Sequence, residues 1–216
     1  MTKIISPSML SADFGNLQSM CEMINQSEAE WLHFDVMDGV FVPNISFGFP
    51  VIESVKKHCR KMLDVHIMIV EPEKYVQRFA KAGAGMLTFH YEATKNPQQV
   101  IDLIRAEGIK VGICINPDVQ VSVLEPFISQ VDMVLLMSVY AGFGGQKFIE
   151  ETYNRIDELK KLTDKLNPNC LIEIDGGVSL DNAAKLFAHG VNVLVAGSSV
   201  FNAENPTKMI TDLMRE

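Results

Sequence analysis

The sequence predicts an α/β protein built as a single closed (β/α)8 barrel, the TIM-barrel fold, over residues 1–216. Short runs rich in β-branched residues recur along the whole chain, amphipathic stretches lie between them, and no shift in composition marks a domain boundary. With 216 residues, of which 47% are hydrophobic and 21% charged, the chain can bury one large core. Eight strand-helix units in a chain of this length suggest the barrel.

Eight runs are predicted as strands because they are short, apolar and rich in β-branched residues: residues 4–5, 31–36, 62–68, 85–90, 110–115, 133–138, 171–175 and 192–196. Amphipathic helices are expected at residues 50–58, 72–82, 152–166 and 205–214. The first two of these helices begin with proline, which suits the first helical position. Strands that alternate with helices indicate βα units and hence a parallel sheet.

The main rival is an open doubly wound sheet. Its usual mark is a G-x-G-x-x-G turn after the first strand, and residues 6–13 (Ser-Pro-Ser-Met-Leu-Ser-Ala-Asp) contain no such turn. The sequence therefore favours the barrel over the open sheet.

The net charge of −8 argues against nucleic acid or a membrane surface as partner, because either would require a basic stripe. A phosphorylated substrate would have to be attracted locally, against the overall field. The four cysteines (Cys21, Cys59, Cys114 and Cys170) are widely spaced without a C-x-x-C pair, and no apolar run approaches the ~18 residues that span a bilayer. We expect a cytoplasmic protein with reduced thiols.

Two distant segments carry metal-ligand chemistry. His33 and Asp35 lie two residues apart near the end of a predicted strand, so their side chains should share one face. His66 and Asp175 occupy similar strand ends, and in a barrel these ends share one face. His90 and Glu92 have the same alternate spacing, so spacing alone does not decide which pair would hold a metal.

Glycine-rich segments follow the last three predicted strands, at residues 142–146, 176–177 and 197–199. Glycine lets backbone N–H groups surround an anion, and barrel enzymes commonly bind phosphate in the loops after the last two strands. Each glycine taken alone could simply serve a tight turn. Three such loops in succession predict a phosphate site without lysine.

Other polar residues have structural explanations. His58 and His189 fall at expected helix C-termini, where an imidazole meets the negative end of the helix dipole. Four aspartates near strand ends or loops are expected to cap helices or to support ligands: Asp13, Asp38, Asp64 and Asp118.

Together these segments resemble the ribulose-phosphate 3-epimerase family. The similar segments run from the first strand to the last, at residues 6–14, 33–39, 41–44, 64–68, 90–93, 142–146, 175–178 and 196–198. The resemblance implies a (β/α)8-barrel isomerase of carbohydrate metabolism, in the pentose phosphate pathway. Such an enzyme interconverts D-ribulose 5-phosphate and D-xylulose 5-phosphate.

The resemblance also assigns roles to residues. It places the metal ligands at His33, Asp35, His66 and Asp175, and the two acid-base groups at Asp35 and Asp175. Substrate contacts fall on Ser8, His66, Gly142, Phe143, Gly144, Gly145, Gly176, Gly177, Gly197 and Ser198. Met37, Met68 and Met137 would form a wall around the reaction intermediate.

The implied mechanism removes a proton from C3 on one face and returns one on the other face, through an enediolate, with Asp35 as base for D-ribulose 5-phosphate and Asp175 as acid. A divalent cation would stabilise the negative charge. Zinc is the first expectation, although mixed imidazole and carboxylate ligands also suit Fe²⁺, Mn²⁺ or Co²⁺.

One departure concerns the loop that begins near Tyr140 and Ala141, where the family usually has proline at the second position. This change bears on substrate preference and leaves D-allulose 6-phosphate 3-epimerase as an alternative. A phosphate-binding barrel without metal is a second alternative, but it would not need the four ligands together. We expect a small sugar phosphate as the ligand. We also expect a homo-oligomer, because the outward helix faces could support a dimer or a hexamer.

Overall fold

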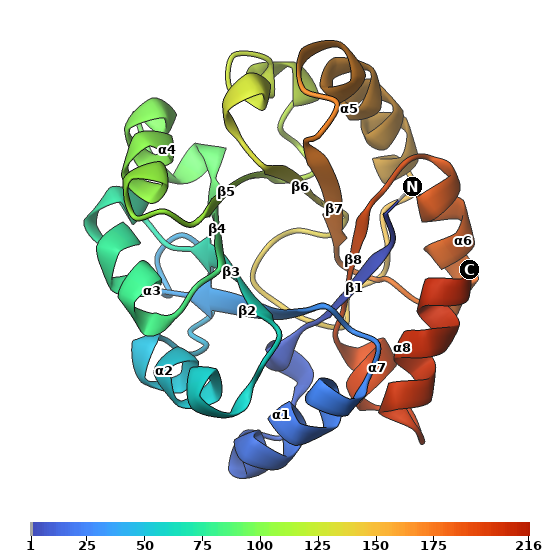
Figure 1. Ribbon diagram of the computed structural model, residues 1–216. Coiled ribbons are helices and arrows are strands. Elements are labelled where there is room, and N and C mark those ends of the chain that lie inside the picture. Colours follow the sequence, from blue (N-terminus) through green and yellow to red (C-terminus); the bar gives the residue numbers. More distant parts are fainter. Residues whose placement is uncertain (1) are drawn as a thin grey trace.

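The computed structural model describes residues 2–216 as a barrel of eight parallel strands surrounded by helices (Figure 1). Each strand pairs with its neighbour in sequence from β2 to β8, and β1 pairs with β8. A parallel bridge between Ser8 and His33 joins β1 to β2. The strands are β1 (Ile4–Pro7), β2 (Trp31–Met37), β3 (Met62–Met68), β4 (Met86–His90), β5 (Lys110–Ile115), β6 (Met133–Met137), β7 (Leu171–Asp175) and β8 (Val193–Ala196). The barrel prediction is confirmed and the open sheet is excluded.

The helices form the outer ring of the barrel. They are α1 (Leu17–Gln26), α2 (Phe49–His58), α3 (Val76–Ala82), α4 (Pro97–Ala106), α5 (Thr152–Leu166), α6 (Leu180–Ala188), α7 (Ser198–Phe201) and α8 (Pro206–Arg215). Local sequence fixes several ends: Asn96 and Asn205 cap α4 and α8 ahead of a proline, and Gly83 ends α3 with φ of 110°. None of the helices in the described chain is long and apolar enough to cross a membrane.

The fifth connection departs from the expected strand-helix repeat. Between β5 and β6 the described chain forms two short 3₁₀ helices, Val121–Leu124 and Ile128–Gln130, in place of an α-helix. Pro126 lies between them, and a proline inside an α-helix would remove a hydrogen bond and clash with the preceding turn. The Arg155 guanidinium of α5 donates to the carbonyls of Met137, Asn116 and Val119, so it ties this connection to the end of β6.

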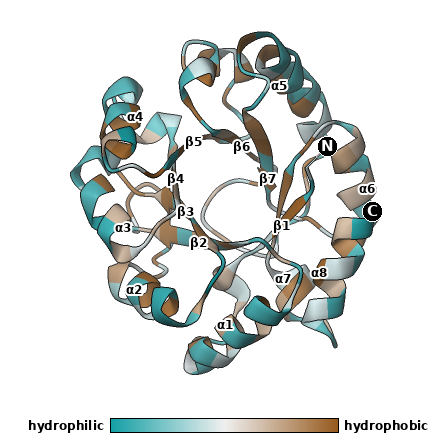
Figure 2. Ribbon diagram, in the orientation of Figure 1, coloured by the Kyte–Doolittle hydropathy of each residue, from teal (hydrophilic) through white to brown (hydrophobic). Residues whose placement is uncertain are grey.

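Strand side chains alternate between the helix layer and the barrel interior. The outward residues of the strands are apolar and buried, as in the Leu32-Phe34-Val36 series of β2, and they pack against the helices. Figure 2 shows hydrophobic colour along the strands and on the helix faces toward them, with hydrophilic colour outside. The alternation therefore directs every second strand residue into the barrel interior, where polar chemistry can take place.

The barrel interior changes from apolar to polar along its axis. Its amino-terminal end is closed by an apolar cluster of Ile4, Trp31, Met86, Met133 and Val193, with Met62 and Leu171 beside them. Two residues further along the strands the interior carries Ser6, His33, Asp64 and Glu173, all fully buried. The next interior positions carry the other three ligands predicted from the sequence, Asp35, His66 and Asp175.

Candidate metal centre

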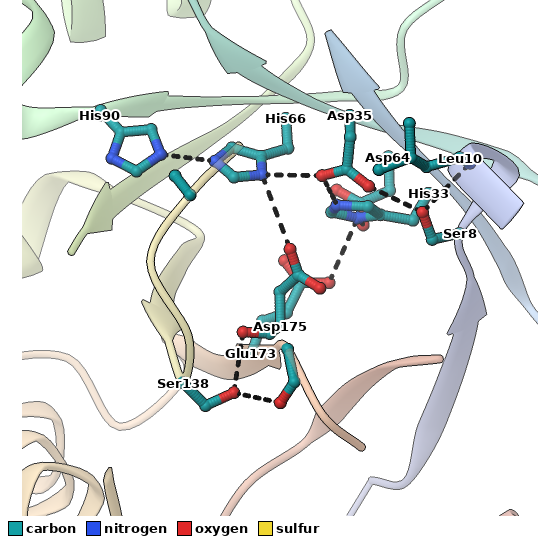
Figure 3. Close-up of polar contacts among 12 residues, drawn as sticks. Ser8, Leu10, His33, Asp35, Asp64, His66, His90, Ser138, Glu173 and Asp175 are labelled. Carbon is teal, nitrogen blue, oxygen red and sulfur yellow. Dashed lines mark hydrogen bonds and ion pairs between the residues drawn. The ribbon is translucent and has the colours of Figure 1, made fainter. Parts of the chain in front are cut away.

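Strand register brings the predicted ligands together at the carboxyl ends of the strands. Asp35 of β2 pairs with His66 of β3, and Met137 of β6 pairs with Asp175 of β7. His33 lies two residues before Asp35 on the same face of β2, one layer deeper in the barrel. Residues far apart in sequence therefore meet in the barrel interior (Figure 3).

The four predicted ligands form one compact group. One nitrogen of each imidazole and one oxygen of each carboxylate all lie within 4.8 Å of one another. Asp35 Oδ1 is 3.2 Å from His33 Nε2 and 3.2 Å from His66 Nδ1, and Asp175 Oδ2 is 4.0 Å from His66 Nδ1. Ligand atoms about 2.0–2.1 Å from a tetrahedral cation lie ~3.3 Å apart. The donor set and its spacing therefore fit a divalent cation with small movements.

The second nitrogen of each imidazole has its own partner. His33 Nδ1 lies 2.6 Å from Asp64 Oδ2, which also accepts from Ser6 Oγ at 3.2 Å. His66 Nε2 lies 2.9 Å from Nε2 of His90. Such partners orient imidazole ligands and fix which nitrogen carries the proton.

The two aspartates have opposite pKa shifts. Burial alone would raise the pKa of Asp35, but charge attraction from His33 and hydrogen bonds from His33 and His66 outweigh it and hold the pKa well below its usual value. Ser8 Oγ donates a further hydrogen bond to Asp35 Oδ2 at 2.7 Å. Burial raises the pKa of Asp175 to about 7, and the nearby Asp35 carboxylate adds to the rise. One carboxyl group therefore favours the ionised form and the other holds a proton near neutrality.

The two histidines also differ in charge preference. Burial opposes protonation of both, but Asp35 and Asp64 outweigh it at His33 and raise the pKa of that imidazole well above its usual value. At His66, burial dominates and His90 adds to it, so the pKa falls to about 4. His66 is therefore a neutral imidazole, the form that binds a metal.

A buried acid lies beneath the centre. Glu173 is fully buried, and neither of its carboxyl oxygens has a hydrogen-bond partner among the described residues. Burial and the neighbouring Asp64 raise the pKa of Glu173 well above its usual value. A neutral Glu173 avoids a second uncompensated negative charge beside Asp64.

A cavity of about 350 Å³ opens over Asp35 and Asp175. Other predicted residues that line it are Ser8, Met37, Met68, Met137, Gly142, Phe143, Gly144, Gly145, Gly176, Gly177, Gly197 and Ser198. His33 and His66 are fully buried below the cavity floor. The three glycine segments thus face the same space as the carboxylates.

The loop after β6 is held by its own side chains. Gln146 Nε2 donates to the carbonyls of Tyr140 and Phe143, at 2.7 and 2.9 Å, and Asn44 Nδ2 donates to the Gly142 carbonyl at 2.8 Å. Ala141, where a proline was expected, donates its N–H to Asn116 Oδ1 at 3.2 Å, a bond that proline could not make. The departure therefore adds an anchor to this loop.

The remaining polar residues mostly have the structural roles expected from the sequence. His189 lies at the end of α6 with Nδ1 2.7 Å from Asp157, and His58 ends α2. Asp13 accepts from Gly15 N as the cap of a short 3₁₀ helix, and Asp64 supports His33. His90 and Glu92 lie beside the four-residue group and outside it.

Several residues of the site were not singled out from the sequence as part of it. Glu173 and Ser6 follow the same alternation as Asp175 and Ser8, so strand parity could have placed them inside the barrel. Leu10, Ser11 and Asn202 also line the cavity, and they come from a 3₁₀ helix and the end of a short helix that carry no comparable periodic signal.

Comparison with known proteins identifies the family of the chain. The sequence profile of the ribulose-phosphate 3 epimerase family matches residues 4–201. The ribulose-phosphate 3-epimerase of Bacillus subtilis is 43% identical over 210 residues, which cover 97% of each chain. A relative from Oryza sativa, named as the cytoplasmic isoform of the same enzyme, is 41% identical over 98% of this chain and 92% of its own.

Solved structures of lower identity share the fold. The tryptophan synthase α-subunit of Pyrococcus furiosus superposes with a TM-score of 0.73 at 14% identity, covering 100% of this chain and 98% of that one. That likeness concerns the barrel alone. The profile match and the full-length relatives show that the chain belongs to the ribulose-phosphate 3-epimerase family.

Proposed function

We propose that this protein interconverts D-ribulose 5-phosphate and D-xylulose 5-phosphate by moving a proton at C3. The observation that carries the proposal is the pairing of Asp35 and Asp175 in one cavity, with their pKa values shifted in opposite directions. Epimerisation beside a ketone needs one base and one acid on opposite faces of the substrate, and this pair supplies both.

Asp35 is the base for D-ribulose 5-phosphate in this proposal. Its low pKa keeps it ionised, and the bond from Ser8 Oγ fixes the carboxylate. Asp175, whose pKa is raised to about 7, holds the proton that is returned to the other face of C3. The roles exchange in the reverse direction, and the state between the two transfers is an enediolate.

His33, Asp35, His66 and Asp175 would hold a divalent cation, most simply zinc, with Fe²⁺, Mn²⁺ or Co²⁺ as the other candidates. When bound, the cation supplies a Lewis acid that stabilises negative charge on the intermediate. Met37, Met68 and Met137 line the cavity with uncharged, polarisable surface and limit water around the reacting carbons.

Backbone N–H groups of the three glycine segments would bind the phosphate. Gly142, Gly145, Gly176 and Gly177 all have positive φ, between 64° and 125°, which glycine adopts without strain. The conformation of these loops therefore depends on residues without a Cβ.

Replacement of Asp175 tests the proposal. Asp175→Asn should reduce epimerase kcat by at least 10³-fold because the amide cannot transfer the proton, while the circular dichroism spectrum stays unchanged. C3 hydrogen exchange in D₂O, followed by NMR, separates proton removal from complete turnover. Asp181→Asn, at an exposed position in α6, is the matched control. Near-normal turnover by Asp175→Asn would refute the assigned role.

A substrate panel tests the choice of sugar. Tyr140 does not line the cavity, whereas Ala141 packs beside its methionine wall. We therefore expect kcat/KM for the pentulose phosphate to exceed that for D-allulose 6-phosphate. The reverse order would favour the alternative substrate.

The wider assignments concern the domain, the pathway, the compartment and the assembly. We propose that residues 1–216 act as one catalytic domain in the pentose phosphate pathway, in the cytoplasm, and as a homo-oligomer. The rice relative's name supports the compartment.

A further inference from the structure

His90 is a buried imidazole that the proposed cation site does not use. It lies at the end of β4 beside His66, with the two Nε2 atoms 2.9 Å apart and the ring centroids at 4.9 Å (Figure 3). Both rings are fully buried. The contact is thus closed to solvent.

Two ring nitrogens at this distance must share one hydrogen, because two bare lone pairs or two N–H groups would repel each other. The tautomers of the two neutral rings are therefore coupled. If Nδ1 of His66 is bare and free to bind a cation, its proton is on Nε2 and points at His90. His90 must then accept on Nε2 and carry its own proton on Nδ1.

On the side of His90 away from His66, one neighbour suits a protonated Nδ1 and another suits a bare Nδ1. Glu92 Oε2 lies 3.7 Å from His90 Nδ1, and Glu92 Oε1 is fixed by the backbone N–H of Asn116 at 2.9 Å. Asn116 Nδ2 lies 3.5 Å from the same Nδ1, and its Oδ1 is occupied by the Ala141 N–H. The carboxylate suits a protonated Nδ1, and the amide N–H suits a bare one.

We propose that His90 is a positioning residue that sets the tautomer of His66, with Glu92 and Asn116 as its alternative partners. In the arrangement paired with Asn116, His66 carries its proton on Nδ1 and donates to Asp35, whose Oδ1 is 3.2 Å away. In the arrangement paired with Glu92, His66 presents a bare Nδ1 to a cation. The inference rests on the proposed function, because it assigns His66 as a ligand.

Cation affinity tests the role of His90. His90→Phe removes the acceptor and should weaken Zn²⁺ binding, measured by competition with a chelating dye, by about 10–100-fold. His90→Gln places an amide oxygen near the position of Nε2 and should restore affinity to within about threefold of wild type. His189→Gln, at an imidazole remote from the centre, is the matched control and should change nothing. Unchanged affinity in folded His90→Phe would overturn the inference.

The state of the ring can be read without any variant. In ¹⁵N-histidine NMR spectra of the zinc-loaded wild type, the His66 signals should show a protonated Nε2, and those of His90 a protonated Nδ1. The opposite assignment would overturn the inference even if His90→Phe fails to fold.

Cys114 provides a rival arrangement, because His66, His90 and Cys114 also bring three ligand atoms within 4.8 Å. The inference is wrong if the wild-type protein binds two equivalents of zinc and Cys114→Ser binds only one. An ion would then lie between His66 and His90, where we place the shared hydrogen. If wild-type protein binds no divalent cation, the proposed function fails instead. The two failures are thus distinguishable.

Discussion

At the scale of single residues, the candidate metal centre depends on the residues that hold its imidazole ligands in place as much as on the ligands themselves. His33 is supported by Asp64 from below and His66 by His90 from the side, so each ring has both nitrogens engaged. An imidazole held at two points loses little further freedom when it binds a ligand. The apolar cluster below and the helix layer outside keep these contacts dry.

The ligands could be predicted from the sequence because strand alternation fixes which residues share a face. His33 shares a face of β2 with Asp35 by that rule, and Asp64 shares a face of β3 with His66. The same rule could not separate His90 from the ligands, because His90 and Glu92 have identical spacing. Glu92 follows the end of β4 in a 3₁₀ turn, so the alternation ends before it.

Asp38 gives a prediction about pH and stability. Its carboxylate accepts the N–H groups of Val40, Phe41 and Val70, each at 2.8 Å, and so joins the loop after β2 to the end of β3. Burial is the largest single influence and opposes ionisation, but the backbone amides together outweigh it and lower the pKa of Asp38. Because the folded pKa lies below the unfolded value of ~3.9, the stabilisation is complete above that pH and disappears as the pH falls through the folded pKa.

Asp38→Asn should therefore lower the free energy of unfolding at pH 7 by roughly 1 kcal/mol, after allowance for solvent screening. Urea denaturation between pH 7 and pH 2.5 measures the difference, which should shrink toward the acid end. Asp181→Asn supplies the baseline for an exposed aspartate. A difference that stays constant across this range would show that ionisation of Asp38 does not contribute.

At the scale of elements, the glycine loops are fixed by close packing as well as by backbone dihedrals. A Cβ at Gly177 would lie 2.6 Å from the backbone nitrogen of Phe148, so the loop after β7 packs directly against the loop after β6. Gly177 also has φ of 64°. Two separate effects, strain and steric conflict, therefore oppose any side chain there.

Gly177→Ala should lower Tm and weaken the binding of inorganic phosphate, because the two loops must separate to admit the methyl group. Gly108→Ala is the matched control: Gly108 has φ of 72° and open space around a Cβ, so it reports strain alone, ~1 kcal/mol. Calorimetry and phosphate titration of both variants measure the effects. Equal losses of stability, with phosphate affinity retained in Gly177→Ala, would contradict the packing argument.

Most strands and the long helix α5 could be predicted from periodicity, but the connection between β5 and β6 could not. Its residues include Val121, Val123 and Leu124, which read as the apolar positions of a helix, and they are buried or partly buried. Pro126 and contacts from Arg155, more than 25 residues later in the chain, decide the conformation instead. A long-range contact of this kind leaves no local signal.

At the scale of the whole molecule, the charge of the protein opposes its proposed substrate. The net charge is −8, and no lysine or arginine lines the cavity in the described chain. A dianionic sugar phosphate would thus approach against a repulsive field and be held by short-range backbone dipoles near the glycine loops. Added salt screens the long-range repulsion, with a Debye length of about 30 Å at 0.01 M and 10 Å at 0.1 M, and leaves contacts inside the cavity largely unchanged.

Raising the ionic strength from 0.01 M to 0.1 M should therefore leave kcat/KM unchanged or increase it, by about twofold, because encounter becomes easier while binding inside the cavity persists. Steady-state assays in a salt whose anion binds phosphate sites weakly measure this, and a second salt with a larger anion controls for competition. An enzyme steered by a basic patch would lose activity over the same range. A several-fold fall in kcat/KM with both salts would mean that a positive local field, and not the backbone dipoles of the glycine loops, brings the phosphate to the barrel.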